Sequence, residues 1–313
     1  MIYIKHQMFD VDSINVKQME YIITFDNLEY EEEFFMNREE LKATADRLRL
    51  VAVDMVYRGK DGHPGPALSI ADIVATLFFD KMRIDPKNPG WEDRDRFILS
   101  KGHACPIYYA ALSERGYFGE KVDDFRLRAL GSKFQGHPVM NKTPGVDMTS
   151  GSLGNGIAIG AGMAIAGKYR KKDYDVFVIA GDGELQEGIC WEGINLAAAK
   201  KLDHMIVFVD KNGWQSGGSV EETIGSNNIA ERFAAFQWHT QEIDGPARDG
   251  HDIDAIRKAI DNARAEKGRP SVIVCNCIKG KGLPFMENNN AWHKGVPSDE
   301  QYKEAVRILG GVQ

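Results

Sequence analysis

Two short segments that carry acidic and amide side chains could hold a divalent cation. An apolar run leads into Gly181-Asp182-Gly183, and the next apolar run leads into Asn212, 30 residues after Asp182. Either segment alone could be an ordinary turn, because glycine is common in turns. Carboxylate and amide oxygens suit Mg²⁺, and glycines let the backbone come close to an anion at a helix N-terminus. Together the two segments predict a magnesium site that also holds a phosphate group.

Four histidines stand in short segments rich in glycine or proline. They are His63 in DGHPGP, His103 in KGHA, His137 in QGHP and His293 in AWHKG. A single histidine in such a loop is more often structural than catalytic, yet histidine is the commonest general acid or base. Zinc binding is the alternative, but the spacing shows no local pair such as HxxxH. Four such segments in one chain therefore favour catalysis.

The elements that must position these residues alternate along the chain. Apolar, β-branched runs predict strands over 175–180, 204–210 and 271–277. Helices are predicted over 38–58 after a cap at Asn37, from Ser69 with a capping-box-like Asp72, and near 104–115, 155–168, 187–201, 252–266 and 299–309. This alternation predicts an α/β fold, a doubly wound, mainly parallel sheet with helices on both faces. Ligands of such sheets bind beyond the carboxyl ends of the strands, where Asp182 and Asn212 would lie.

The first 35 residues differ from the rest. Residues 29–35 are a charge run with interleaved aromatics, which is more typical of a solvated surface than of a site. We therefore divide the chain into an N-terminal extension of unknown role, 1–35, and one cofactor-binding domain, 36–313. The alternative is that Met36 is the biological start.

Composition excludes several classes of protein. The 46 acidic residues outnumber the 39 lysines and arginines, so no broad nucleic-acid surface is expected. The N-terminus has no secretory signal pattern, and the longest low-charge stretch, 150–167, is too short to cross a membrane. We expect a soluble, cytoplasmic protein. The four cysteines form no CxxC pair and are expected to be buried, reduced thiols, with Cys275 and Cys277 on one face of a strand.

The GDG segment with Asn212 behind it resembles the signature of thiamin diphosphate enzymes, and its particular form resembles transketolase. The resemblance covers residues 38–313. It implies thiamin diphosphate and Mg²⁺ as cofactors, with the metal held by Asp182, Asn212 and the carbonyl of Trp214. The chain departs from the family at Lys211, where Asn or Asp is usual.

The same resemblance assigns roles to the histidines. It implies that His63 and His103 flank the cofactor diphosphate and the substrate hydroxyls, that His137 contacts the substrate, and that His293 lies near the thiazolium ring and the donor ketose. Lys294 stands where a glycine often follows that last histidine. The stretch 149–162 matches the family segment beside the thiazolium, although its small residues also suit close helix packing. The implied cofactor contacts are His103, Leu153, Gly154, Gly181, Asp182, Gly183, Glu184 and Asn212.

The resemblance also implies an activity and a partner. Transketolases transfer a two-carbon ketol group from a ketose phosphate to an aldose phosphate. Their cofactor-activating glutamate lies in a second, pyrimidine-binding domain, and this sequence ends after the first domain. We therefore expect the N-terminal subunit of a split transketolase, which is inactive without a C-terminal, pyrimidine-domain subunit. Two copies of each chain would form an α₂β₂ assembly.

Two other functions stay open at this point. One is a subunit of another thiamin diphosphate enzyme, of the 2-oxo-acid dehydrogenase or 1-deoxyxylulose-5-phosphate synthase type. The other is a non-catalytic regulatory homologue. The HPG, GH and GHP histidines favour a sugar ketol transferase over the first, and the retention of Asp182 and Asn212 counts against the second.

Overall fold

The computed structural model describes residues 2–4, 7–9, 36–119, 122, 124–225, 228–245 and 249–310. Its internal contacts divide the chain into two units, residues 1–35 and 36–313. In the first unit, β1 (Ile2–Ile4) pairs antiparallel with β2 (Gln7–Phe9). The charge run at 29–35 lies outside the described residues. All further description concerns the second unit.

The second unit is built on a five-stranded parallel sheet with the order β3-β4-β5-β9-β8. The strands are β3 (Arg96–Leu99), β4 (Val176–Gly181), β5 (Met205–Asp210), β8 (His239–Ile243) and β9 (Ser271–Cys275). The three predicted strands are the three central ones. Both edge strands went unpredicted, because β3 has only four residues and β8 reads HTQEI, with one apolar side chain.

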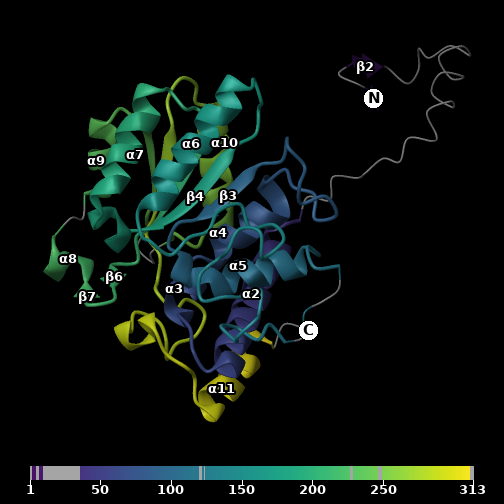
Figure 1. Ribbon diagram of the computed structural model, residues 1–313, viewed down its shortest axis with the longest axis vertical. Helices are drawn as coiled ribbons and strands as arrows, with labels where there is room; N and C mark the ends of the chain where they lie inside the picture. Colours follow the sequence, from purple (N-terminus) through teal and green to yellow (C-terminus); the bar gives the residue numbers. More distant parts are fainter. Residues whose placement is uncertain are drawn as a thin grey trace, which may run out of the picture. The chain divides into compact units, whose positions relative to one another are not determined.

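Helices cover both faces of this sheet (Figure 1). One core joins Phe177, Phe208 and Ile273 of the strands to α2 (Arg38–Gly59), α4 (Ala71–Thr76), α5 (Cys105–Glu114), α10 (Ile253–Ala265) and α11 (Asp299–Leu309). The other core joins Val178 and Val207 to α6 (Asn155–Tyr169), α7 (Gly188–Ala199) and α9 (Ile229–Ala235). Successive strand residues face opposite cores, as the pleat requires. The predicted doubly wound α/β fold is confirmed.

The helix predicted from Ser69 is wrong in its start. The chain forms α3 (Pro64–Leu68) and then α4, which begins at Ala71 without a side-chain cap and continues into the π-helical turn η2 (Leu77–Lys81). The Ser69 hydroxyl instead donates to Asp210 Oδ1, at 2.6 Å. The Ser69 side chain therefore bonds to a buried acceptor on a distant strand and does not cap the helix. By contrast, Asn37 caps α2 as predicted, in a capping box with Glu40.

Two further expectations concern thiols and membrane segments. All four cysteines are free and buried, and Cys275 and Cys277 face the same core. Over the ranges that the structure describes, no helix combines the length and the apolar character that a bilayer span requires. Even α2, at 22 residues, carries charged side chains along its length.

Candidate cofactor site

Asp182 lies at the carboxyl end of the sheet, directly after β4. The residue is only 3% exposed. Its carboxylate accepts hydrogen bonds from the backbone N–H of Gly183, at 2.8 Å, and of Gly213, at 2.6 Å. Burial and the neighbouring Asp210 raise the pKa of Asp182 to about 7. The carboxylate therefore has two backbone donors, but no described side chain forms an ion pair with it.

The segment after β5 brings Asn212 to the same place. In the pairing of β4 with β5, Gly181 lies opposite Asp210. The two segments that follow these strands therefore meet just beyond their carboxyl ends. The bond from Gly213 N–H to Asp182 joins the two predicted segments directly. Gly183 permits this approach, since a Cβ there would lie 2.9 Å from Gln215 Cβ. Asp182 and Asn212 are thus brought together as the sequence indicated.

Asp210 holds Asn212 in position and forms a buried charge cluster that the sequence did not reveal. It accepts from Asn212 Nδ2 at 2.7 Å and from Ser69, and it pairs with the ammonium of Lys101, which also donates to Pro66 O at 3.0 Å. Burial alone would raise the pKa of Asp210, but Lys101 holds it below its usual value. The sequence feature that could have revealed this cluster is the position of Lys101, two residues before His103.

The oxygen atoms that could bind a metal at the carboxyl ends of these strands fit Mg²⁺. They are the Asp182 carboxylate, the amide oxygen of Asn212, which now accepts from Trp214 N–H at 3.0 Å, and the backbone around Trp214. The Asp182 carboxylate is buried, and its negative charge is not balanced by an ion pair with a described side chain. A divalent cation would balance it, and hard oxygen ligands are those that Mg²⁺ prefers. Lys211, which differs from the residue usual in the family, does not place its ammonium at the metal site, because the ammonium pairs with Glu242 at 3.0 Å.

Three of the four predicted histidines form a cluster. The ring centroids of His63 and His103 are 5.2 Å apart, those of His63 and His293 are 5.6 Å apart, and those of His103 and His293 are 5.2 Å apart. Burial is the main cause that lowers their pKa values, to about 4 for His63 and about 3 for His293, and well below the usual value for His103. These imidazoles are therefore neutral at pH 7.

His137 makes no ring contact with this cluster. A Cβ on Gly151 would lie 3.2 Å from its Cγ, which places it against the 149–162 segment. Burial lowers its pKa, and Arg128 lowers it further. Among the described residues, no three His, Cys, Asp or Glu side chains are arranged to hold a metal together.

Lys279 orients the third ring of the cluster. It is fully buried and donates to Asn290 Oδ1, at 2.8 Å, and to His293 Nδ1, at 3.0 Å. Burial and Lys101 lower its pKa to about 8. Because Nδ1 accepts, His293 carries its proton on Nε2 and can donate from there. Lys279 was not predicted from the sequence.

Glu184, predicted as a cofactor contact, has both carboxylate oxygens hydrogen-bonded within the chain. Its carboxylate accepts from Ser100 Oγ, from Gly154 N–H at 2.7 Å and from Gly181 N–H at 3.0 Å, and it is 4% exposed. It therefore ties together the segments that carry His103, Leu153 and Asp182. We assign it a positioning role, because its oxygens are engaged within the chain.

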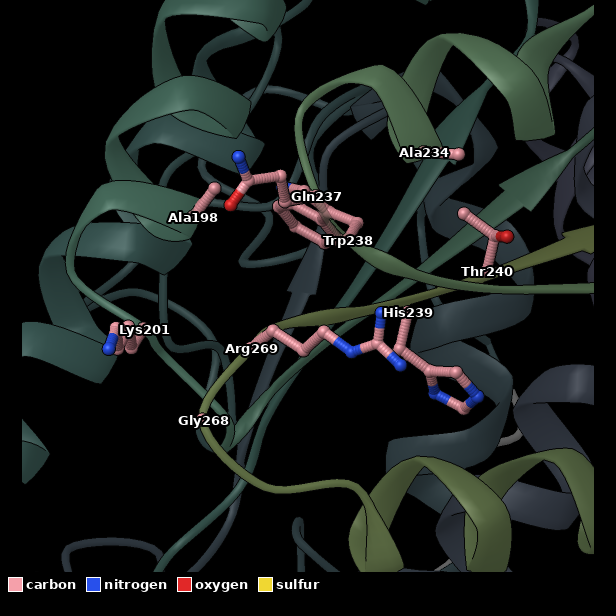
Figure 2. A pocket seen from close by; sticks show the side chains of 9 residues that line it. All are labelled: Ala198, Lys201, Ala234, Gln237, Trp238, His239, Thr240, Gly268 and Arg269. Carbon is pink, nitrogen blue, oxygen red and sulfur yellow. The ribbon is translucent and has the colours of Figure 1, made fainter.

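A separate pocket of about 670 Å³ lies at the other end of the strands, beside the amino ends of β8 and β9 (Figure 2). Trp238 and His239 at the start of β8 line it, together with Gly268 and Arg269 just before β9. None of the predicted site residues lines it. The candidate site is thus defined by converging polar side chains and not by this cavity.

Comparisons with known proteins point to one family. The family model "Transketolase, thiamine diphosphate binding domain" matches residues 41–312. The 6-deoxy-6-sulfo-D-fructose transketolase subunit SqwG of Clostridium sp. (strain MSTE9) is 40% identical over 270 residues, covering 86% of this chain and 96% of that protein. One subunit of the apulose-4-phosphate transketolase of Phocaeicola vulgatus is 37% identical, covering 87% of this chain and 94% of that protein.

Solved structures give the same result. The transketolase of Campylobacter jejuni superimposes with a TM-score of 0.82 at 34% identity, covering 88% of this chain and 43% of that one. The transketolase of Leishmania mexicana gives 0.80 at 32% identity, covering 88% and 42%. The chain thus spans about two fifths of the length of these solved relatives. It belongs to the transketolase family, a family of transferases, and residues 41–312 are its thiamin diphosphate-binding domain.

Proposed function

We propose that this chain is the N-terminal, cofactor-binding subunit of a two-chain transketolase. It transfers a two-carbon ketol group from a ketose phosphate to an aldose phosphate, and it does so only with a separate subunit that carries the pyrimidine-binding domain. Support comes from length: the chain covers nearly all of two proteins named as transketolase subunits, but about two fifths of full-length transketolases. The working assembly is α₂β₂ in the cytoplasm.

In this proposal the sheet edge holds Mg²⁺ and the cofactor. Asp182, Asn212 and the Trp214 carbonyl bind the metal, and the backbone at Gly181, Gly183, Leu153 and Gly154 surrounds the cofactor. Thiamin diphosphate supplies the carbanion chemistry that breaks and re-forms the carbon–carbon bond. The observation that carries the assignment is the buried Asp182 carboxylate, which the Gly213 N–H joins to the Asn212 segment and which forms no ion pair with a described side chain.

The histidines handle hydroxyls and protons of the substrate. His63, His103 and His293 are neutral, so each can donate one hydrogen bond and accept another. Lys279 fixes the proton of His293 on Nε2, which presents a donor to the cluster. His137 contacts the sugar. Neutral imidazoles can therefore hold substrate hydroxyls at pH 7 through hydrogen bonds.

Calorimetry tests the cofactor assignment. Thiamin diphosphate should bind the chain in the presence of Mg²⁺, and the partner subunit should be supplied if the chain alone binds weakly. Thiamin without its diphosphate, and thiamin diphosphate with EDTA, are the matched controls and should not bind. Equal uptake with and without Mg²⁺ would contradict the metal site.

Reconstitution tests the activity. The chain should be mixed with a separate polypeptide that carries the pyrimidine-binding domain, and two-carbon transfer from a ketose phosphate to an aldose phosphate should be followed. Neither chain alone should turn over. Decarboxylation of a 2-oxo acid by the mixture, without ketol transfer, would point to another class of thiamin diphosphate enzyme.

A further inference from the structure

His251 is not one of the clustered histidines, yet a hydrogen bond joins it to the segment that carries Lys279. Its Nε2 accepts from the backbone N–H of Ile278 at 2.8 Å. Ile278 lies beyond the end of β9, and its N–H is bonded to this side chain and not to a neighbouring strand. His251 is therefore the acceptor that fixes the backbone directly before Lys279.

Close backbone contacts hold the two segments together. Gly250 N–H donates to Asn276 O at 3.3 Å. A Cβ on Gly250 would lie 2.7 Å from the carbonyl carbon of Asn276, so glycine is what permits this approach. On the other side, Gly280 N–H donates to Gly65 O at 3.1 Å, in the segment of the first clustered histidine. Lys279 thus lies between two anchored stretches of backbone.

A buried carboxylate determines which nitrogen of His251 carries the proton. Asp72 Oδ2 lies 2.8 Å from His251 Nδ1, and Asp72 also pairs with the buried guanidinium of Arg49. Burial would raise the pKa of Asp72, but Arg49 and His251 bring it below its usual range, so this carboxylate is an acceptor only. Nδ1 therefore donates, which leaves Nε2 free to accept from Ile278. Both neighbours of the ring require the same tautomer.

The connection continues from Ile278 to the histidine cluster. Lys279 directly follows Ile278, and its ammonium bonds to Asn290 Oδ1 and His293 Nδ1. Lysine carries its charge on a flexible four-carbon stem, so the place of the ammonium depends on where the backbone is fixed.

We infer that His251 is a positioning residue: it fixes Ile278, and through that backbone the Lys279 ammonium that orients His293. Asp72 holds His251 in the tautomer that this requires. The effect on the orientation of His293 follows from these contacts alone, whereas an effect on turnover rests on the proposed function.

Nitrogen NMR of the full chain tests the tautomers without any substitution. In protein with isotope-labelled histidine at pH 7, His251 should carry its proton on Nδ1, and His293 should carry its proton on Nε2. The resonances are assigned by replacing one histidine at a time. A proton on Nε2 of His251 would leave the Ile278 N–H without its acceptor and would overturn the inference.

Two amide variants separate the two hydrogen bonds of His251. In His251→Gln the amide oxygen can replace Nε2 as the acceptor for Ile278, and the His293 signal should keep its Nε2–H pattern. In His251→Asn the shorter amide can still donate to Asp72 but does not reach Ile278, and His293 should show the averaged pattern of two tautomers. His239→Asn is the matched control, because His239 Nδ1 also bonds to a side-chain oxygen, at 3.0 Å, at the start of β8. Equal loss in both His251 variants, or no change in His251→Asn, would refute the positioning role.

A pocket of about 400 Å³ allows the missing ring to be supplied from solution. His251, Asp72 and Arg49 line it. Its other charged side chains are Arg38, Lys42, Asp46, Asp249, Asp252 and Lys281. In His251→Ala, imidazole added at about pH 8, where it is mostly neutral, should restore the His293 signal saturably. Pyrrole has an N–H donor but no acceptor nitrogen and should not restore it. Restoration by pyrrole, or none by imidazole, would contradict the role of the acceptor.

The reconstituted enzyme connects this position to turnover. His251→Asn should lower kcat/KM for the donor ketose roughly fivefold, the effect of losing one hydrogen bond, and His251→Gln should stay within about twofold of the unaltered chain. Equal losses in the two variants would indicate a merely structural role. Absence of ketol transfer by the unaltered pair would count against the proposed function and leave the NMR result standing.

Discussion

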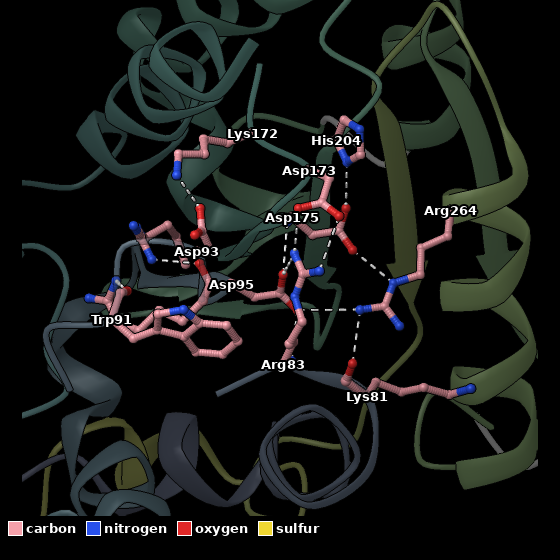
Figure 3. A network of polar contacts seen from close by, with 12 residues as sticks. Lys81, Arg83, Trp91, Asp93, Asp95, Lys172, Asp173, Asp175, His204 and Arg264 are labelled. Atoms are coloured by element: carbon pink, nitrogen blue, oxygen red, sulfur yellow. Dashed lines mark hydrogen bonds and ion pairs between the residues drawn. The ribbon is translucent and has the colours of Figure 1, made fainter. Parts of the chain in front are cut away.

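Two buried carboxylates at opposite ends of the strands, Asp175 and Asp182, differ in their partners. At the amino-terminal edge, Asp95 and Asp175 precede β3 and β4 and lie within a network of ion pairs (Figure 3). Asp95 accepts from the N–H of Arg83, at 2.8 Å, and of Asp175, at 2.9 Å, while Asp175 also pairs with Arg264 and His204. These carboxylates find their partners inside the chain.

At the carboxyl ends of the strands, Asp210 pairs with Lys101, but Asp182 forms no ion pair with a described side chain. Burial would raise the pKa of both Asp175 and Asp182, but His204 and Arg264 bring that of Asp175 below its usual value, whereas that of Asp182 rises to about 7. A buried carboxylate without a cation is unfavourable, so such a group usually marks a site for one. The difference between the edges teaches that partner supply, and not residue type, separates a structural ion network from a binding site.

Removing a carboxylate from the structural edge should give the largest effect. Asp95→Ala leaves two backbone N–H groups without their acceptor and removes one of the two carboxylates that pair with Arg264. We expect the free energy of unfolding to fall by about 3–5 kcal/mol, the usual cost of breaking a buried charge network. Urea denaturation measures it. Cofactor affinity, measured at a temperature where the variant is folded, should stay within about twofold, and a large loss of affinity would show that the edges are coupled.

The corresponding change at the binding edge should act on the ligand instead. Asp182→Asn removes the charge that Mg²⁺ requires, and affinity for thiamin diphosphate with Mg²⁺ should fall at least roughly 100-fold, since even indirect partners of a metal ligand contribute about 10- to 100-fold. The melting temperature without ligand should change little, because the lost charge had no cation partner. Retained Mg²⁺-dependent affinity would remove Asp182 from the metal site.

The contributions of His63 and His204 to stability should depend on pH with opposite signs. His63 has a lowered pKa of about 4, so between about pH 6.5 and 4 the unfolded chain binds more protons than the folded chain. Acid therefore destabilises the folded chain through His63, and His63→Gln should gain relative stability as the pH falls through this window. Denaturation of both proteins between pH 7 and 4 measures the difference.

His204 should behave in the opposite way. Asp175 raises the pKa of His204, so its contribution is complete below the unfolded value of about 6.5 and is lost as the pH rises through the folded pKa. His204→Gln should therefore lose most relative stability in acid. The effect is small, because the His204 side chain is 40% exposed. Parallel pH dependence in the two variants would contradict the contrast between the edges.

The smallest effect is expected at Lys211, which stands at the binding edge but pairs away from the site. Lys211→Asn restores the residue type usual in the family. Loss of the partly exposed pair with Glu242 should cost less than about 1 kcal/mol. Cofactor affinity should change by less than about twofold. A tenfold change, measured by calorimetry, would mean that Lys211 turns toward the cofactor.

Most of the fold could be read from the sequence because its signals are local. The central strands are nearly continuous apolar runs. Asn37 and Glu40 form a capping box, which marks the start of a helix within four residues. Ser69 and Asp72 spell out a similar start, yet Ser69 bonds to Asp210, while Asp72 pairs with Arg49 and His251. A local pattern fails where a distant charged group offers a better partner, and the sequence does not show that distance.

The sequence by itself determined the chemistry of the site: a carboxylate and an amide behind two strands, and histidines in four glycine- or proline-containing loops. Only the tertiary structure decided which groups hold them. Lys101 pairs with Asp210 across 109 residues, Lys279 orients His293, and Glu184 spans three segments. The physical reason is that a residue type fixes what an atom can donate or accept, whereas burial and neighbours brought together by folding decide its charge, its orientation and its partner.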